Sequence, residues 1–199
     1  MIAAVLAGAN LASTRVLYKN RAFLNNFAMH LGQNHHQYRA LHLTDTLFDK
    51  NGVSNSLTGK LRQIQSNDIA IDFMACHETA LAEPHLHITA PLSAFTLPDS
   101  GGQQLRIPDL LEIARIFYEG GYDRVICSTE GPMVAVALFL KYMFNVPCSF
   151  FMHTDWMEYI KCTTQASQHE RDRIRRVLRL LYSQFDKIFV LNREHRDWL

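Results

Sequence analysis

The stretch DRVICSTEGPMVAVALFLKYMFNVPCSFFMHTDW, residues 123–156, carries the pattern that decides the fold. Two short apolar runs, residues 124–129 and 148–152, lie on either side of a long apolar segment that opens with Gly131-Pro132. Proline suits the first position of a helix, because the N–H that it lacks would have no partner there. The long segment is apolar almost all round, which is typical of a well-buried helix. The stretch therefore predicts strand, helix and strand, the repeating unit of a parallel sheet.

The same alternation runs through the chain from residue 39 onward. The later predicted strands are continuous apolar runs, as expected when helices cover both faces of a parallel sheet. We therefore predict an α/β protein with a Rossmann-like open parallel sheet of about six strands and helices on both faces. The predicted strands are residues 40–45, 69–76, 85–89, 124–129, 148–152 and 187–192. Predicted helices begin at Ser54, Pro108, Pro132, Glu158 and Arg193, and residues 91–107 are predicted to form a loop.

Composition limits the classes of function. With 199 residues and 48% hydrophobic content, the chain suits one globular domain with a substantial core. The 20 Lys and Arg nearly balance the 19 Asp and Glu, so overall charge gives no support for nucleic-acid binding. The four cysteines have irregular spacings, which favours buried free thiols in a reducing compartment. No cluster has metal-ligand spacing and no apolar run reaches the length of a membrane span, so we expect no bound metal and a cytoplasmic protein.

Residues 1–38 stand apart from the alternation and form an N-terminal extension of uncertain role. Four apolar residues within this extension recur at helical spacing, which predicts one amphipathic helix. These residues are Leu24, Phe27, Ala28 and Leu31. The predicted Rossmann-like domain comprises residues 39–199.

Polar residues follow three of the predicted strands. In an open parallel sheet, ligands bind outside the carboxyl ends of the strands, so we expect residues 45–54, 128–132 and 153–156 to share one crevice. Pro132 also places a helix N-terminus there, where free amides and the helix dipole favour an anion. Gly52 removes a side chain and lets a ligand approach the backbone. The sequence lacks the glycine patterns of dinucleotide-binding and P-loop proteins.

Each of these residues also has a purely structural interpretation. His153, at a strand end, could serve only as a local hydrogen-bonding residue, and Asp45 could bond a turn amide. Glu130 could be an ordinary charge in the first turn of a helix. Trp156 and Tyr159 could belong to the core. The residue types alone leave both interpretations open.

Taken in order, these segments resemble a known family. TDT (44–46), NGVSNSLTGKL (51–61), residues 123–159 and YSQFDKIFVLN (182–192) look like the N-terminal half of a family 4 glycosyltransferase of the GT-B fold. The resemblance covers residues 39–199. Its most specific part is the middle block, where a Gly-Pro helix start leads to a strand that ends in His-Thr-Asp.

The resemblance implies a retaining, hexosyltransferase-like enzyme that moves a sugar from a nucleotide-sugar donor to a sugar or lipid acceptor, without a cofactor or metal. This half would bind mainly the acceptor. A C-terminal nucleotide-binding domain with a pair of glutamates would complete the enzyme, and since this sequence lacks that domain, we expect the chain alone to be inactive. The alternative is a non-catalytic α/β module that binds a small ligand or a protein partner.

The same resemblance assigns roles to residues. His153 would be catalytic and would reach the donor sugar near the reacting centre. Gly52 and Val53 would approach the diphosphate and the acceptor, although Asn51-Gly52 stands where the family usually has two glycines. The other predicted donor- or acceptor-binding residues are Asp45, Glu130, Gly131, Thr154 and Asp155.

Arg171, Arg175 and Arg179 recur every four residues, on one face of a predicted helix. A solvated helix face is the usual explanation for such a row. The alternative is contact with an anionic membrane surface or with a phosphorylated lipid acceptor. We therefore expect a cytoplasmic protein that is either free or held at the inner face of the membrane.

Overall fold

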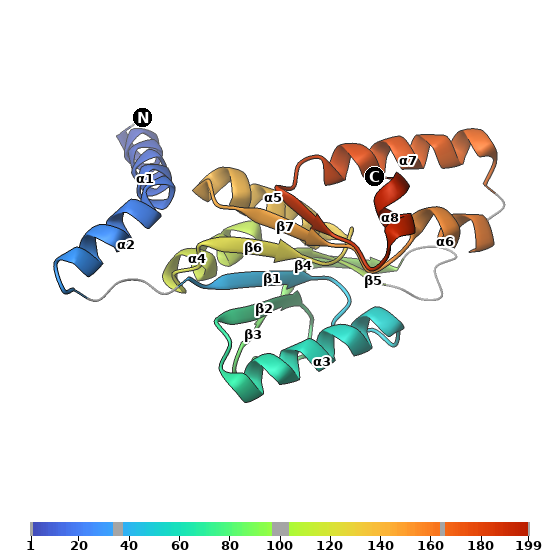
Figure 1. Ribbon diagram of the computed structural model, residues 1–199, viewed down its shortest axis with the longest axis horizontal. Coiled ribbons are helices and arrows are strands. Elements are labelled where there is room, and N and C mark those ends of the chain that lie inside the picture. The colour runs from blue at the N-terminus through green and yellow to red at the C-terminus, as the bar shows by residue number, and fades with distance from the viewer. Residues whose placement is uncertain (1, 34–37, 97–103, 164–165, 199) are drawn as a thin grey trace.

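The chain folds around an open parallel sheet (Figure 1). The structure, a computed structural model, describes residues 2–33, 38–96, 104–163 and 166–198. Within these residues, six strands form the sheet in the order β3-β2-β1-β6-β7-β8. They are β1 (Ala40–Thr44), β2 (Ile71–Cys76), β3 (Leu86–Thr89), β6 (Arg124–Cys127), β7 (Cys148–Phe151) and β8 (Lys187–Phe189). The predicted Rossmann-like α/β fold is confirmed.

The strand order creates a crevice between β1 and β6. β1 pairs in parallel with β2 on one side and with β6 on the other. The chain therefore winds outward in opposite directions from this junction, and the connections that leave the two strands diverge. Ligands of open α/β sheets bind in the resulting gap, outside the carboxyl ends of the strands. That edge lies on the right in Figure 1, where the arrowheads point.

Helices cover both faces of the sheet. α3 (Gly52–Asn67) packs through Leu57, Leu61 and Ile64 against one face. α4 (Leu110–Glu119) and α5 (Pro132–Phe144) belong to a second, larger core cluster, which also includes Leu178 and Tyr182 of α7 (Gln168–Tyr182). Neighbouring residues of β2 alternate between the two clusters, since Phe73 belongs to the first and Met74 to the second. Two further helices follow the last strands: α6 (Trp156–Thr163) comes after β7, and α8 (Arg193–Trp198) comes after β8.

The predicted loop at residues 91–107 is wrong. β4 (Pro91–Thr96) and β5 (Gln104–Pro108) pair as an antiparallel two-stranded sheet of their own. The side chains of β4 beyond Pro91 are exposed. The prediction relied on apolar residues that alternate or cluster, and a solvent-facing hairpin does not need that pattern.

Two helix starts also differ from the prediction. Pro108 ends β5 instead of opening α4, and Asp109 caps that helix by accepting the N–H groups of Leu111 and Glu112. α3 begins at Gly52 instead of Ser54. Its cap is Asn51, whose side chain accepts the Ser54 N–H at 2.8 Å. The capping residue lies one position after the predicted helix start in α4 and three positions before it in α3.

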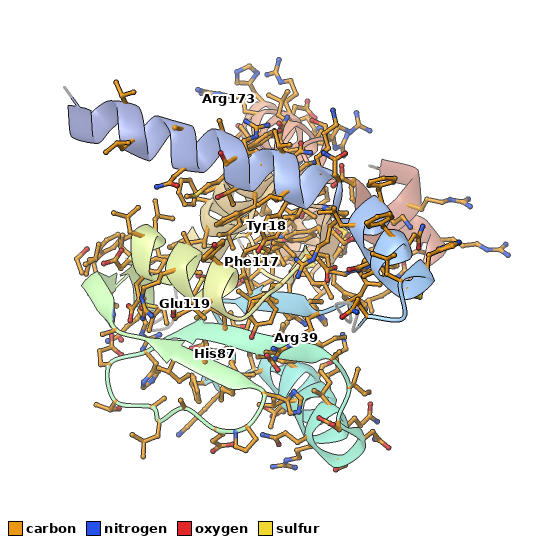
Figure 2. All side chains as sticks on the ribbon, turned by 90° about the vertical axis from the view of Figure 1, so that its left-hand side faces the viewer. Tyr18, Arg39, His87, Phe117, Glu119 and Arg173 are labelled. Carbon is orange, nitrogen blue, oxygen red and sulfur yellow. The ribbon has the colours of Figure 1, made fainter. Side chains whose placement is uncertain are left out.

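Two helices precede the sheet, α1 (Ile2–Lys19) and α2 (Arg21–His30), and the sequence predicted only the second. Tyr18 fixes the end of α1 to the domain, because its ring lies 5.2 Å from that of Phe144 and 6.1 Å from that of Phe117 (Figure 2). α2 has no buried residue among those described. Its predicted apolar face is therefore exposed, as Leu24, Phe27 and Leu31 show.

A buried carboxylate ties strand β2 to its surroundings near the amino edge of the sheet. Asp72 Oδ2 accepts a hydrogen bond from Arg39 Nη2 at 2.5 Å and another from the Tyr122 hydroxyl. Its other oxygen, Oδ1, lies 2.7 Å from His85 Nδ1. His87 Nε2 lies 3.8 Å from Asp72 Oδ2, and Figure 2 labels both Arg39 and His87. Burial alone would raise the pKa of Asp72, but the hydrogen bonds of His87 and Tyr122 and the charge of Arg39 hold it well below its usual value.

The four cysteines are free thiols. Cys76, Cys127 and Cys148 are buried as predicted, whereas Cys162 is exposed. None of the described helices is both long enough and apolar enough to cross a bilayer.

Candidate active site at the carboxyl edge of the sheet

Asp45 and Thr129 join the two strands that flank the crevice. Asp45 follows β1 and Thr129 follows β6. The Thr129 hydroxyl donates to Asp45 Oδ2 at 2.6 Å and accepts the backbone N–H of Asp45 at 2.9 Å. The pair therefore fixes the geometry of the crevice at the point where the sheet changes its winding direction.

Asp45 also caps helix α5. Its Oδ1 accepts the Met133 N–H at 3.0 Å, and the Gly131 amide helps to hold the same carboxylate. The prediction that this helix start offers free amides to a substrate anion therefore fails for these amides, since the chain's own carboxylate occupies them. Burial raises the pKa of Asp45, and the bonds from Thr129, Met133 and Gly131 oppose that rise. Position 131 must be glycine for this approach, because a Cβ there would lie 2.6 Å from Asp45 Oδ2.

Glu130 is largely enclosed beside Asp45. It precedes the Gly131 cap, so it is not a charge of the first helical turn as the structural interpretation supposed. The Tyr182 hydroxyl donates to Glu130 Oε1 at 2.7 Å. Burial raises the pKa of Glu130, while Tyr182 and the nearby Trp156 indole lower it. The Trp156 N–H itself lies outside hydrogen-bonding geometry, so one donor beside this carboxylate remains unused.

His153 lies just beyond β7, half-buried, with its ring 4.7 Å from that of Phe151. Lys60 Nζ of α3 lies 3.6 Å from the centre of the Phe151 ring. Burial, with a contribution from the Lys60 charge, lowers the pKa of His153 to about 4. The imidazole is therefore neutral at physiological pH, and its Nε2 is buried without a partner among the described residues.

Asp155 caps the next helix. Its Oδ1 accepts the N–H groups of Met157 and Glu158, both at 3.0 Å. Its Oδ2 lies 3.4 Å from Nε2 of the buried His195 in α8. This carboxylate therefore has a structural role at the start of α6 and a contact with the last helix. Thr154 lies between His153 and Asp155 and is half-buried.

The glycine loop is less closely tied to this edge. Gly52 is the exposed first residue of α3, and a Cβ there would meet no heavy atom within 4 Å. Val53 packs against the core cluster beneath α3. No contact recorded among the described residues joins either one to Asp45 or His153. The predicted roles of Gly52 and Val53 toward a diphosphate stay predictions.

Buried polar atoms without partners gather at the carboxyl edge. In the described residues these include Thr46 Oγ1 after β1, His153 Nε2 after β7, Trp156 Nε1 at the start of α6 and His195 Nδ1 in α8. Such atoms almost always have partners in folded proteins. Neutral donors and acceptors left open in a crevice suit the hydroxyl groups of a carbohydrate. No group of three or more metal-ligating side chains occurs in the part of the chain that the structure describes.

Several residues of this site were absent from the sequence-based prediction. Lys60, Tyr182 and His195 act through contacts with residues far along the chain. Thr129 had a usable signal, since it lies in the polar group after a predicted strand. The other three lie on helices and carry no local pattern that distinguishes them from surface or core residues.

The three arginines that recur every four residues in α7 have different surroundings. Arg171 is partly buried and donates to the Ala166 carbonyl at 3.1 Å and to Gln168 Oε1 at 2.9 Å. Arg175 is half-buried, and its Nε is enclosed. Arg179 is exposed. The predicted single outward face of these three arginines is therefore wrong, because the first two turn toward α6.

Comparison with known proteins gives one match. The family model described as Glycosyltransferase Family 4 matches residues 50–199, which is three quarters of the chain. The matched region begins just before α3 and contains the segments after β6 and β7 that form the crevice. No curated protein matches the sequence.

Proposed function

The chain belongs to glycosyltransferase family 4, and on that basis we propose that it forms the acceptor-side domain of a GT-B enzyme that transfers a sugar from a nucleotide-sugar donor with retention of anomeric configuration. A second, nucleotide-binding domain would complete the active site, and this chain would be inactive without it. The reaction would need no metal and no cofactor. Carbohydrate or glycolipid biosynthesis is the corresponding role.

The observation that carries this proposal is the state of His153. Its imidazole is neutral, and its Nε2 is buried without a partner at the edge of the crevice. A neutral imidazole can accept a hydrogen bond from a sugar hydroxyl or donate one, depending on its tautomer. The buried nitrogen regains a partner when a hydroxyl binds, so binding is favoured and the sugar is oriented.

The side chains at the carboxyl edge of the sheet suit the charges that would develop during transfer. As the diphosphate leaves, positive charge develops on the sugar and negative charge on the departing oxygens. Fixed dipoles and hydrogen bonds directed at these charges lower the barrier. The carboxylates of Asp45 and Glu130 follow β1 and β6, the two strands that flank the crevice, and would favour the developing positive charge, while Thr154 and Asp155 would contact the acceptor.

The test is transfer by the full-length protein, measured as nucleoside diphosphate released from a panel of nucleotide sugars and as glycosylated product. The proposal predicts that one donor supports turnover, that the product keeps the anomeric configuration of the donor, and that His153→Ala abolishes transfer while the protein stays folded. Unchanged turnover in the His153→Ala protein would contradict the role of His153. Release of diphosphate from no donor would contradict the enzyme proposal itself.

A second candidate is a non-catalytic module that binds a small ligand or a protein. One observation favours it: Asp45 and Asp155 both serve as helix caps, so two of the predicted substrate-binding carboxylates already have structural roles. The transfer assay separates the two candidates. Binding of a sugar without turnover in the full-length protein would support the module.

We also propose peripheral contact with an anionic membrane at the cytoplasmic face, through the outward side of α7. The residues on that side differ from the predicted arginine row. Val177 and Leu180 are 64% and 68% exposed, and Arg173 and Arg176 are exposed beside them. Their spacing places them on one helical face. A face that combines arginine with exposed aliphatic residues suits the boundary between lipid headgroups and acyl chains.

A further inference from the structure

A cavity lies between α6 and α7, next to the candidate active site. Its volume is about 390 Å³, and it is lined by Met157, Glu158, Lys161, Gln168, Arg171 and Arg175. α6 begins at Trp156, so the first lining residue directly follows one of the unpartnered groups of the crevice. The cavity is therefore close to the crevice along the chain, and its lining residues are distinct from those of the crevice.

The cavity carries an excess of positive charge. Lys161 and Glu158 pair with each other at 3.2 Å, so their charges offset each other. Arg171 bonds only neutral acceptors, the Ala166 carbonyl and the Gln168 side chain. Arg175 has no hydrogen bond or ion pair among the described residues. Two guanidinium groups therefore face the cavity without a carboxylate to neutralise them.

Arg175 is the decisive residue. Its Nε is enclosed and lacks an acceptor. A buried donor of a charged group without a partner lowers the stability of the fold. Such a residue is therefore expected where a ligand supplies the missing acceptor. An oxyanion does so well, because the planar guanidinium presents several donors in a fixed geometry that matches phosphate oxygens.

We propose that the cavity between α6 and α7 binds a phosphate monoester group, held by Arg175 and Arg171. The volume lies within the range of small-molecule sites, about 300–1,000 Å³, so it accommodates a phosphorylated head group rather than a bare ion alone. The inference rests on the proposed function only in naming the acceptor as the source of that group. Under that function, the acceptor would place its phosphate in the cavity and its hydroxyl in the adjoining crevice.

The test is binding without any donor, which keeps it separate from the transfer assay. The full chain is titrated with glycerol 3-phosphate by isothermal titration calorimetry, and its melting temperature is followed with the same ligand. Arg175→Gln removes the unpartnered charge, and Arg62→Gln is the matched control, since Arg62 is an exposed arginine of α3 and does not line the cavity. We expect Arg175→Gln to weaken binding about tenfold or more, and Arg62→Gln to weaken it less than about twofold.

The melting temperature gives a second readout that a purely structural arginine would not produce. The ligand should raise the melting temperature of the wild type and of Arg62→Gln, but not that of Arg175→Gln. Without ligand, Arg175→Gln should melt no lower than the wild type, because it removes an enclosed donor that has no partner. A clear loss of stability in ligand-free Arg175→Gln would contradict the assignment of Arg175 as a binding residue.

Vesicles distinguish a lipid source from a soluble one. Phosphatidylcholine vesicles that contain phosphatidic acid present a phosphate monoester, whereas those with phosphatidylglycerol present a phosphodiester. A preference for phosphatidic acid that Arg175→Gln abolishes and Arg62→Gln keeps would identify a lipid phosphate. Binding of glycerol 3-phosphate without that preference would identify a soluble phosphate. Absence of both, or equal losses in both variants, would overturn the proposal. Transfer activity can fail independently of all these results.

Discussion

The carboxylate of Asp45 occupies the space that a side chain at position 131 would need. A Cβ on Gly131 would lie 2.6 Å from Asp45 Oδ2 and 2.7 Å from its Cγ. Through this approach, one carboxylate connects the end of β1 to the start of α5 and to Thr129 after β6. The crevice is therefore shaped by a contact between two residues that are distant in sequence.

Gly131→Ala should destabilise the protein by about 1–3 kcal/mol, because the carboxylate must move away from the new methyl group and α5 loses its cap. Urea unfolding measures the change. Gly59→Ala is the matched control. Gly59 lies inside α3 with no heavy atom within 4 Å of an added Cβ, so alanine should stabilise this helix by about 0.5–1 kcal/mol. Equal effects of the two substitutions would show that the contact with Asp45 does not contribute to the free energy of unfolding.

His153→Ala should lower kcat/KM of the full-length enzyme by about a hundredfold or more, if its nitrogen contacts the reacting sugar as proposed. His169→Ala serves as the control, since His169 is an exposed residue of α7 outside the crevice. Its kcat/KM should stay within about twofold of the wild type. Circular dichroism spectra of both variants establish that they are folded. The assignment fails if the two variants lose activity to a similar extent.

His153 should titrate far below an ordinary histidine. Its folded pKa is lowered to about 4, so the ring should stay neutral from pH 8 down to about pH 5. Nitrogen chemical shifts from NMR report the protonation state directly. A His153 midpoint near 6.5, the value of an unperturbed imidazole, would mean that the ring is not enclosed as the structure shows.

Asp72 should make stability depend on acid pH. Its folded pKa is depressed, so its contribution is fully present above its unfolded pKa of 3.8 and is lost as pH falls through that value toward the lower folded pKa. Asp72→Asn should therefore cost about 2 kcal/mol at pH 7, where Arg39 loses its ionised partner, and less at pH 3. Urea midpoints at the two pH values test this. A penalty that does not shrink in acid would show that Asp72 acts only through its shape.

Arg176→Gln should weaken binding to anionic vesicles about fivefold, the effect of one basic residue near a charged surface. Co-sedimentation with vesicles containing phosphatidylglycerol, at low and high salt, is the measurement. Arg62→Gln is the control, because Arg62 is an exposed residue of α3, on the opposite side of the sheet from α7 (Figure 1). Equal losses would mean that net charge, and not the outward side of α7, governs binding.

The sequence was sufficient for the central sheet and its helices. The strands could be predicted because parallel strands buried on both faces are continuous apolar runs, and Pro132 marked the start of α5 correctly. The β4–β5 hairpin was missed because its side chains face solvent. In the N-terminal extension, α1 was missed, and the apolar face predicted for α2 is exposed, since periodicity shows that a helix has an apolar side without showing what covers it.

The sequence predicted where the candidate site lies better than it predicted what its residues do. Residues after β1, β6 and β7 were placed at one edge by the geometry of parallel sheets alone. The capping roles of Asp45 and Asp155 depend on side-chain directions that the sequence does not contain. The same holds for Arg175, which was grouped with Arg171 and Arg179 by spacing, although the three have different surroundings.

The contact between Asp155 and His195 gives α8 a mechanical connection to the crevice. The two side chains are 3.4 Å apart, and the same carboxylate holds the first turn of α6 beside His153. A force that pulls α8 away would strain this contact and release the start of α6. The position of the last helix would then be transmitted to the surroundings of His153, the residue proposed to meet the sugar, so that a rotation of α8 adjusts its reactivity.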